Sequence, residues 1–329
     1  MSGPDVRAGA AGADQGAAGA ATPATPAGAD ASADAAAAPF ELPEELRIDT
    51  AVARRVIGEF IRGQLAQAGF DRAVLGLSGG IDSALVAYLV AEAIGADRLL
   101  CVLMPYRTSS PESVAHADEV VRRLGCARDL VEITAMVDAY FGDGEAAGAA
   151  GEEGRTASAL RRGNLMARMR MAVLYDRSVT WSGLVVGTGN KTEALIGYTT
   201  LFGDSACAFA PIGDLYKSQV RQLAADIGVP DAILRKAPSA DLWPGQTDES
   251  EAGFSYPELD RLLHAMIDRR RTHEELVAAG FAPETIARVE RMVAASEFKR
   301  QMPPIAKLGP RTTGVDYLYP RRRPGSARR

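Results

Sequence analysis

The chain has 329 residues, of which 47% are hydrophobic, and a formal net charge of −5 at pH 7. This length can hold one large domain or two small ones, and the composition is ordinary for a globular protein. The negative charge argues against an extended nucleic-acid-binding face, which needs an excess of lysine and arginine, and no segment approaches the ~20 uninterrupted apolar residues of a membrane span.

Residues 1–40 differ in composition from the rest of the chain. Between Met1 and Phe40 the only large apolar side chain is Val6, and most other residues are Ala, Gly, Pro, Thr and Asp. Such a segment cannot bury enough surface to offset chain entropy, so we expect a disordered arm. The arm has neither the apolar core of a secretory signal nor the arginine content of a transit peptide, which favours a cytoplasmic protein.

Short apolar runs alternate with longer helical patterns over residues 41–318, where we expect one folded domain. The expected strands are residues 73–77, 99–104, 130–133 and 184–187, and the expected helices are residues 83–94, 112–124, about 159–178, 217–227, 256–271 and 283–299. Residues 142–154 are expected to form a flexible loop. Alternating strands and helices predict an α/β fold, a doubly wound parallel sheet covered by helices on both faces, with ligands beyond the carboxyl ends of the strands.

The first strand leads into Ser78-Gly79-Gly80-Ile81-Asp82-Ser83. Two adjacent glycines allow a tight turn, and the following helix N-terminus offers unpaired N–H groups, so an anion should bind there. Asp82 lies in the first helical turn, where it can cap the helix or hold a magnesium ion for bound phosphates. The string is neither a Walker A loop nor the dinucleotide-binding fingerprint.

The fourth strand leads into a second glycine-bearing turn, Gly187-Thr188-Gly189-Asn190-Lys191-Thr192-Glu193. Thr188 can cap a helix with Glu193 solvated on its surface. Alternatively, Glu193 can join Asp82 around Mg²⁺, which prefers a few carboxylates together with phosphate oxygens and water.

Lys217 opens the helix that follows Pro211-Ile212-Gly213-Asp214-Leu215-Tyr216. A lysine at a helix N-terminus opposes the helix dipole unless an anion neutralises it, which indicates a phosphate contact. Further on, the polar stretch after Leu242 can be an ordinary surface loop or a loop that closes over a site.

Cysteines and terminal charges add little to the chemistry. Cys101, Cys126 and Cys207 show no C-x-x-C spacing, and the chain has only three histidines, so neither a disulfide scaffold nor a zinc site is expected. Reduced thiols suit a cytoplasmic enzyme. Residues 319–329 are rich in arginine and are expected to be a solvated, flexible basic tail.

Six strings in order carry a resemblance to a known family: LGLSGGIDSA, GNLMARMRM, VVGTGNKTE, PIGDLYKSQV, APSADLWPGQTDE and FKRQMPPI. The first is similar to the SGGxDS loop of the ATP pyrophosphatases, and together they resemble the NAD synthetase family over residues 44–308. The resemblance implies a homodimer of the adenine nucleotide α-hydrolase-like fold. It also implies ATP-dependent conversion of nicotinic acid adenine dinucleotide (deamido-NAD) to NAD, through an adenylylated carboxylate that ammonia attacks, with AMP and pyrophosphate as the other products.

The resemblance also implies roles for individual residues. The expected ATP-binding residues are Gly76, Leu77, Ser78, Gly79, Gly80, Ile81, Asp82, Ser83, Thr188, Lys217 and Ser239. Asp82 and Glu193 would hold Mg²⁺, and Asp82 and Lys217 would be catalytic. Arg168 and Lys299 would contact deamido-NAD, although helix geometry alone would make Arg168 a solvated surface residue.

Three positions depart from better-known members of that family. Leu201 and Ala208 stand where a lysine and an aspartate contact the substrate, and Phe298 stands where a histidine is common. Either neighbouring groups such as Asp204 and Ser205 or a second subunit compensate, or the enzyme uses a different carboxylate acceptor.

Two other classes remain as alternatives. A non-catalytic nucleotide-binding paralogue would be expected to lose Asp82, Glu193 and Lys217, which are all present. An RNA-modifying member of the superfamily would add basic surface and a cysteine pair.

The residues before position 40 have neither the cysteine nor the core of a glutaminase, so free ammonia is the expected nitrogen donor.

Overall fold

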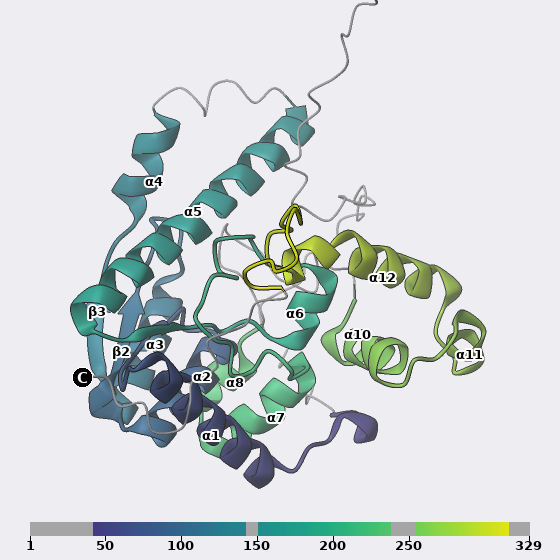
Figure 1. Cartoon of the computed structure of the whole chain (residues 1–329), viewed down its shortest axis with the longest axis horizontal. Coiled ribbons are helices and arrows are strands. Elements are labelled where there is room, and N and C mark those ends of the chain that lie inside the picture. Colours follow the sequence, from purple (N-terminus) through teal and green to yellow (C-terminus); the bar gives the residue numbers. More distant parts are fainter. Residues whose placement is uncertain (1–41, 143–150, 238–253, 316–329) are drawn as a thin grey trace, which may run out of the picture.

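The computed structural model describes residues 42–142, 151–237 and 254–315, with side chains from residue 158 onward in the second range. The elements, labelled as in Figure 1, are η1 (Glu44–Leu46), α1 (Thr50–Ala68), β1 (Ala73–Gly76), α2 (Ile81–Ile94), η2 (Ala96–Arg98), β2 (Leu99–Leu103), α3 (Pro111–Leu124), β3 (Ala127–Leu130), α4 (Thr134–Phe141), α5 (Gly151–Trp181), β4 (Leu184–Val186), α6 (Lys191–Ile196), α7 (Lys217–Ile227), α8 (Asp231–Arg235), α10 (Tyr256–Leu263), the π-helical turn η4 (His264–Asp268), α11 (His273–Ala278), α12 (Pro283–Ala295) and η5 (Glu297–Arg300).

The described strands form one parallel sheet in the order β3-β2-β1-β4. The chain builds outward from β1 through β2 to β3, then crosses back to place β4 on the other side of β1. Leu75 of β1 is paired with Val186 of β4, so these two strands end side by side. A reversal of strand order of this kind opens a crevice at the carboxyl ends, where ligands bind in open α/β sheets.

Each central strand is buried on both faces, because its alternate residues enter two different cores. On β2, Cys101 and Leu103 join the core that α1, α2, α3, α7 and α8 cover, whereas Leu100 and Val102 join the core that α4 and α5 cover. Side chains alternate across a strand, so burial on both faces requires a continuous apolar run. The predicted doubly wound sheet with helices on both faces is confirmed.

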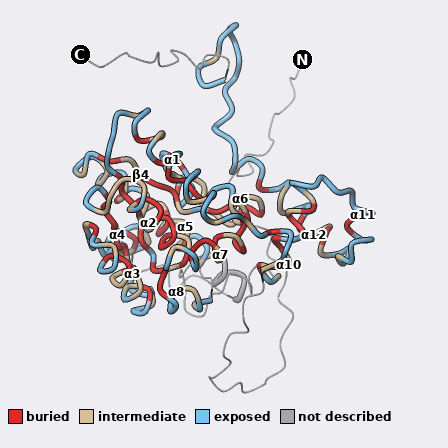
Figure 2. The backbone as a smooth tube through the Cα atoms, turned by 90° about the horizontal axis from the view of Figure 1, so that it is seen from below, coloured by how far each residue is buried: buried red, intermediate tan, exposed pale blue. Residues whose placement is uncertain are grey.

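A third hydrophobic core lies between α6, α10, α11 and α12 of the C-terminal half and η1 near the start of the described chain. Its buried members include Leu259 and Leu263 of α10, Ile286 of α12 and Ile196 of α6. Figure 2 shows this lobe beside the sheet body, with buried segments of its own. Tyr216, directly before α7, also belongs to this core, so the chain passes from the lobe into the sheet body at Lys217.

Helix ends follow local capping chemistry. The Asp49 side chain accepts a hydrogen bond from the N–H of Val52 at the start of α1, and the Ser110 side chain accepts one from Glu112 N at the start of α3. Pro111 takes the first position of α3, where its missing N–H costs nothing.

The third strand was predicted at the wrong place. The prediction was residues 130–133, whereas β3 spans Ala127–Leu130. β3 is an edge strand whose polar residues form ion pairs, Arg128 with Asp118 at 2.6 Å and Asp129 with Arg177 at 2.6 Å. Of the apolar residues that suggested a strand, Leu130 ends β3, whereas Val131 and Ile133 follow it, and Ile133 is the buried residue that precedes α4.

Several helix boundaries also differ from the predictions. Helix α5 begins at Gly151 rather than near residue 159, so residues 151–154 of the predicted flexible loop belong to this helix instead. The predicted helix 256–271 is α10 followed by a π turn, and the predicted helix 283–299 is α12 followed by a 3₁₀ turn. The elements α1, α4, α8 and α11 were not predicted, and α6 was predicted only as one of two alternatives.

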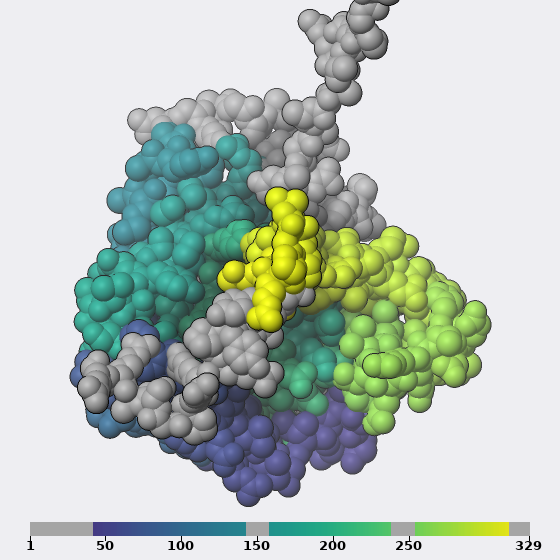
Figure 3. Space-filling view, in the orientation of Figure 1, coloured from purple at the N-terminus to yellow at the C-terminus, as the bar shows by residue number. Residues whose placement is uncertain are grey.

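The described C-terminal segment, residues 301–315, is almost wholly exposed, with Leu308 at 98%. Figure 3 shows it in yellow, in front of neighbouring elements. None of the described helices has the length and apolar character needed to cross a membrane. The predicted arm (1–40), the tail (319–329), Ser239 and the stretch after Leu242 lie outside the described residues.

Candidate active site

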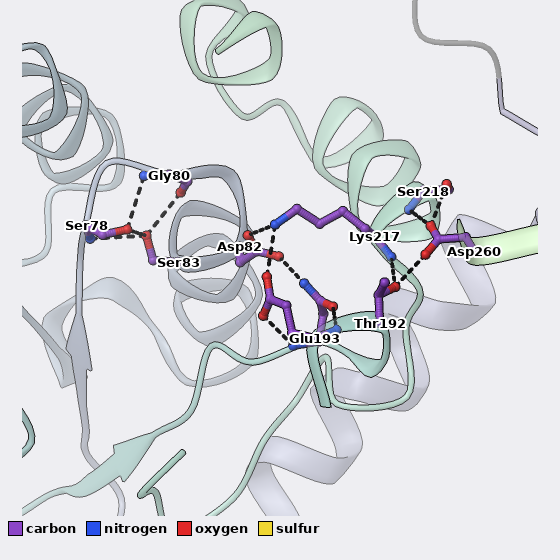
Figure 4. Close-up of polar contacts among 10 residues, drawn as sticks. Ser78, Gly80, Asp82, Ser83, Thr192, Glu193, Lys217, Ser218 and Asp260 are labelled. Atoms are coloured by element: carbon purple, nitrogen blue, oxygen red, sulfur yellow. Dashed lines mark hydrogen bonds and ion pairs between the residues drawn. The ribbon is translucent and has the colours of Figure 1, made fainter. Parts of the chain in front are cut away.

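The glycine-rich loop after β1 is held by its own serine hydroxyls. Ser83 Oγ donates to the carbonyl oxygen of Gly80 at 3.1 Å and accepts from Ser78 N at 3.2 Å, while Ser78 Oγ accepts from Gly80 N at 3.2 Å. These bonds fix the turn between β1 and α2 (Figure 4). The first N–H groups of α2 have no acceptor within their helix, so they are available to an anion at this edge of the sheet.

Gly79 is required at its position for two reasons. Its φ is +79°, and a Cβ atom there would lie 2.0 Å from the carbonyl oxygen of Ser113 on α3. The first turn of α3 therefore packs directly against the loop. Lys236, which follows α8, donates from Nζ to Ser113 Oγ at 2.7 Å and brings a second lysine near the loop.

The loop after β4 is tied to the first loop by Asn190. The Asn190 side chain accepts from Glu193 N at 3.0 Å, and the Glu193 carboxylate accepts from Asn190 N at 3.3 Å, which forms a capping box at the start of α6. The Asn190 amide also donates from Nδ2 to Asp82 Oδ1 at 2.9 Å. The cap of α6 is therefore Asn190 rather than Thr188, and Glu193 is not solvated on the helix surface but takes part in the cap.

Lys217 lies between the two carboxylates. Its Nζ is 2.6 Å from Asp82 Oδ2 and 3.1 Å from Glu193 Oε1, and its side chain is only 3% exposed (Figure 4). The unfavourable position of a lysine at the start of α7 is thus offset by two anionic partners. These three residues come from three segments that only the sheet topology brings together.

This pair of carboxylates fits a magnesium ion that arrives with a phosphate ligand. Among the described residues, no three His, Cys, Asp or Glu side chains gather where they could hold a metal by themselves. Asp82 and Glu193 already share one cation, the ammonium of Lys217, and the three groups together keep a net negative charge. Mg²⁺ is commonly bound through one or two carboxylates, with phosphate oxygens and water completing its shell.

Arg168 and Lys299 meet at another loop, the segment between α6 and α7. The Arg168 guanidinium donates to the carbonyl oxygen of Leu201 at 3.4 Å. Lys299 Nζ donates to the carbonyl oxygens of Gly197 and Thr199, both at 2.8 Å, and burial lowers the pKa of its ammonium. The two predicted substrate residues thus contact the same short loop, Arg168 from α5 and Lys299 from η5.

The three departures from the family pattern also have defined places. Leu201 contributes its carbonyl oxygen to Arg168, and Ala208 N donates to the carbonyl oxygen of Val185 beside β4. Phe298 lies on η5 with half of its surface exposed. Near Leu201, Asp204 accepts from Thr199 Oγ1 and Thr200 N, so this carboxylate orders the loop.

Some residues of the site were not found by sequence reasoning. Asn190 carries a local signal, because an Asn followed three residues later by Glu is a capping-box pattern. Asp260 of α10 carries none, although it is fully buried and accepts hydrogen bonds from Thr192 and Ser218 beside the site. Thr188, predicted to bind ATP, lies half-buried between β4 and α6.

Comparisons with known proteins agree with this geometry. A family model described as NAD synthase matches residues 53–303. The NH(3)-dependent NAD(+) synthetase of Trichlorobacter lovleyi is 51% identical over 276 residues, which cover 84% of this chain and 97% of that protein. The solved structure of the NH3-dependent NAD synthetase from Campylobacter jejuni is 32% identical with a TM-score of 0.65, covering 79% of this chain and 100% of that one. The NMN synthetase from Francisella tularensis is 28% identical with a TM-score of 0.66, covering 79% of this chain and 99% of that one.

Proposed function

The chain belongs to the NAD synthase family, and on that premise we propose which residues carry out the reaction. The enzyme is a ligase that forms a C–N bond. It uses ATP to amidate the nicotinate carboxyl group of deamido-NAD with ammonia, giving NAD, AMP and pyrophosphate through an adenylylated carboxylate. The observation that supports the residue assignment best is the Lys217 ammonium between Asp82 and Glu193, at the end of the glycine-rich loop.

The loop Ser78–Ser83 and the first turn of α2 bind the β and γ phosphates of ATP as a unit, with Gly76 and Leu77 leading into the turn. This assignment rests on the helix N-terminus that follows the loop, whose first N–H groups have no acceptor within the helix, and on the close backbone approach that Gly79 allows. Thr188, Lys217 and Ser239 complete the ATP-binding set. With the terminal phosphates held, the α-phosphorus is left as the electrophile.

The chemistry proceeds in two displacements. A carboxylate oxygen of deamido-NAD attacks the α-phosphorus, a P–O bond forms, and the bond to pyrophosphate breaks. Ammonia then attacks the activated carboxyl carbon, AMP leaves, and the nitrogen loses a proton to give the amide. Lys217 supplies a buried positive charge where the departing pyrophosphate gains negative charge, and electrostatic stabilisation of this kind is typically a large contribution to rate.

Asp82 and Glu193 are the proposed ligands of Mg²⁺. When bound, the ion would neutralise charge on the phosphates. Asp82 also orients Lys217 and Asn190, because its Oδ2 accepts from Lys217 and its Oδ1 accepts from Asn190.

Arg168 and Lys299 are the proposed contacts for deamido-NAD. Both are cations that lie against the Gly197–Leu201 segment, where an anionic dinucleotide would gain charge-assisted hydrogen bonds. The sequence alternatives, another carboxylate acceptor or a silent paralogue, are not favoured by relatives of about 50% identity that are NAD synthetases.

A homodimer in the cytoplasm is part of the same proposal. Val52, Val56 and Phe60 recur at intervals of four along α1, and all three are exposed by 39–57% of their surface. An apolar stripe on one helix is the kind of surface that a second subunit covers. Light scattering of the purified protein should give twice the monomer mass, and a monomer at micromolar concentration would contradict this part.

Incubation of the enzyme with ATP, Mg²⁺, ammonium and deamido-NAD, followed by mass spectrometry, tests the function directly. NAD, AMP and pyrophosphate are expected in equal amounts. ADP with phosphate, or faster consumption of another small carboxylate than of deamido-NAD, would refute the assignment. Glutamine in place of ammonium should give little product.

A further inference from the structure

Asp260 is a fully buried carboxylate for which the reaction described above has no role. It lies on α10, in the C-terminal lobe, and none of its surface is exposed. Its Oδ1 accepts from Thr192 Oγ1 at 2.5 Å, and its Oδ2 accepts from Ser218 N at 2.7 Å and from Ser218 Oγ at 2.6 Å. A buried carboxylate is costly unless its oxygens are satisfied in this way.

The hydrogen bonds around Asp260 have a fixed direction. Thr192 Oγ1 accepts from the backbone N–H of Lys217 at 2.9 Å, so its own proton is the one donated to Asp260. Backbone N–H groups can only donate. Asp260 must therefore act as an acceptor with both oxygens, and a chain of bonds runs from Lys217 N through Thr192 to Asp260.

This chain of bonds connects two residues of the proposed site. Thr192 directly precedes Glu193 on α6, and Ser218 directly follows Lys217 on α7, so Asp260 holds the neighbours of both (Figure 4). Burial raises the pKa of Asp260, while its hydrogen bonds and the charge of Lys217 act in the opposite direction.

We propose that Asp260 is a positioning residue for the ligase reaction, which fixes the Lys217 ammonium relative to Glu193 and Asp82 by holding the starts of α6 and α7 in register. The inference rests on the proposed function, since it assumes that Lys217 acts on ATP. A displacement of about 1 Å in a catalytic group can cost about a hundredfold in rate, whereas deamido-NAD binding should not depend on this contact.

Asp260→Asn tests the proposal with little change in size. The single amide oxygen can replace Oδ2 and accept from both Ser218 donors, so both hydrogen bonds of Ser218 are kept. The amide NH₂ would then face Thr192 Oγ1. Because an NH₂ group cannot accept a hydrogen bond, the Thr192 hydroxyl proton would lose the acceptor that Asp260 Oδ1 provides. We expect kcat at saturating substrates to fall at least about tenfold, with the KM for deamido-NAD within about twofold of wild type.

Thr192→Val breaks the same chain of bonds while leaving Asp260 with Ser218. It should lower kcat in the same way, and the double variant should be no worse than the more affected single variant, because residues that act as one unit are not additive. If Asp260→Asn fails to fold, Thr192→Val alone still decides the matter. Glu258→Gln, an exposed carboxylate on the same helix, is the matched control and should leave both constants unchanged.

The outcomes separate this inference from the proposed function. Folded Asp260→Asn and Thr192→Val enzymes with kcat within about twofold of wild type would overturn the positioning role. If Lys217→Met is inactive in the same assay, only the inference about Asp260 has then failed. If Lys217→Met retains normal turnover, the assignment of Lys217 fails as well.

Discussion

At the scale of single residues, Lys217 depends on its partners for its place in the interior. A buried ammonium without a counter-ion would be strongly unfavourable, and removing one member of a buried ion pair typically costs about 3–5 kcal/mol. Asp82 and Glu193 provide that compensation. If Lys217 contacts ATP as proposed, the phosphate would offer a further anionic partner to the same ammonium.

Replacement of Asp82 by Asn should lower turnover at least about a hundredfold, because it removes a proposed Mg²⁺ ligand and the 2.6 Å ion pair with Lys217. Steady-state rates at saturating Mg²⁺ measure this. Asp71→Asn, on the exposed turn before β1, is the control and should behave as wild type. An Asp82→Asn enzyme with more than about half of the wild-type rate would remove Asp82 from the site.

Replacement of Arg168 by Ala should raise the KM for deamido-NAD at least about tenfold, equivalent to ~1.4 kcal/mol for a lost charge-assisted hydrogen bond. The KM for ATP should change little, since Arg168 contacts the loop at Leu201 rather than the glycine-rich loop. Initial rates with each substrate varied in turn give both constants. Equal effects on both substrates, or on neither, would argue against the assignment.

At the scale of elements, the sequence predicted what depends on local pattern. The strands near residues 73–77, 99–104 and 184–187 were found because burial on both faces makes them continuously apolar. β3 was misplaced because an edge strand needs no such run. Short helices such as α6 and α8 have too few residues to show a period.

The site residues, like the elements, could be predicted only where a local sequence pattern marks them. Asp82, Glu193 and Lys217 stand in recognisable strings, so their residue types and order pointed to the chemistry before any contact was known. The Asp260 contact with Ser218 joins residues 42 positions apart, and the Asn190 contact with Asp82 joins residues 108 positions apart. No local pattern encodes contacts that arise only when helices pack.

The turn between β1 and α2 offers a comparison within one element. Gly79→Ala would place a Cβ 2.0 Å from the Ser113 carbonyl oxygen at a φ of +79°, whereas Gly80→Ala would meet only Ser78 Oγ at 3.4 Å. Gly79→Ala should therefore shift the loop, weaken ATP binding at least about tenfold and lower stability by about 1–3 kcal/mol. Calorimetric titration of ATP and thermal melting of both variants measure this. Equal losses in the two variants would show that close approach to α3 does not decide the loop's shape.

At the scale of the whole molecule, the amino-terminal arm is expected to contribute little. Deletion of residues 2–38 removes no large apolar side chain except Val6. Turnover should stay at the wild-type level and stability within ~0.5 kcal/mol. Kinetic assay and thermal melting of the truncated protein are the measurements, and loss of activity or of the native oligomer would show that the arm packs on the enzyme.

The passage of the chain from lobe to sheet body at Lys217 has a consequence for how the enzyme loses activity. Tyr216 is packed among lobe residues, while Val220 and Leu223 of α7 are packed under the sheet, so the ammonium lies at the joint between two cores. Parts of a protein can unfold locally at a free-energy cost well below that of global unfolding. The cooperative units that open in this way often coincide with contiguous structural motifs, and this lobe is such a unit. Local unfolding of α10 would remove the contacts that hold the starts of α6 and α7, and so displace Glu193 and Lys217. The backbone amides of β1 and β2 would stay protected from hydrogen exchange. As denaturant is added, we therefore expect activity to be lost before the sheet unfolds. The loss of activity would then measure the stability of the contacts between lobe and sheet body, not the stability of the whole fold.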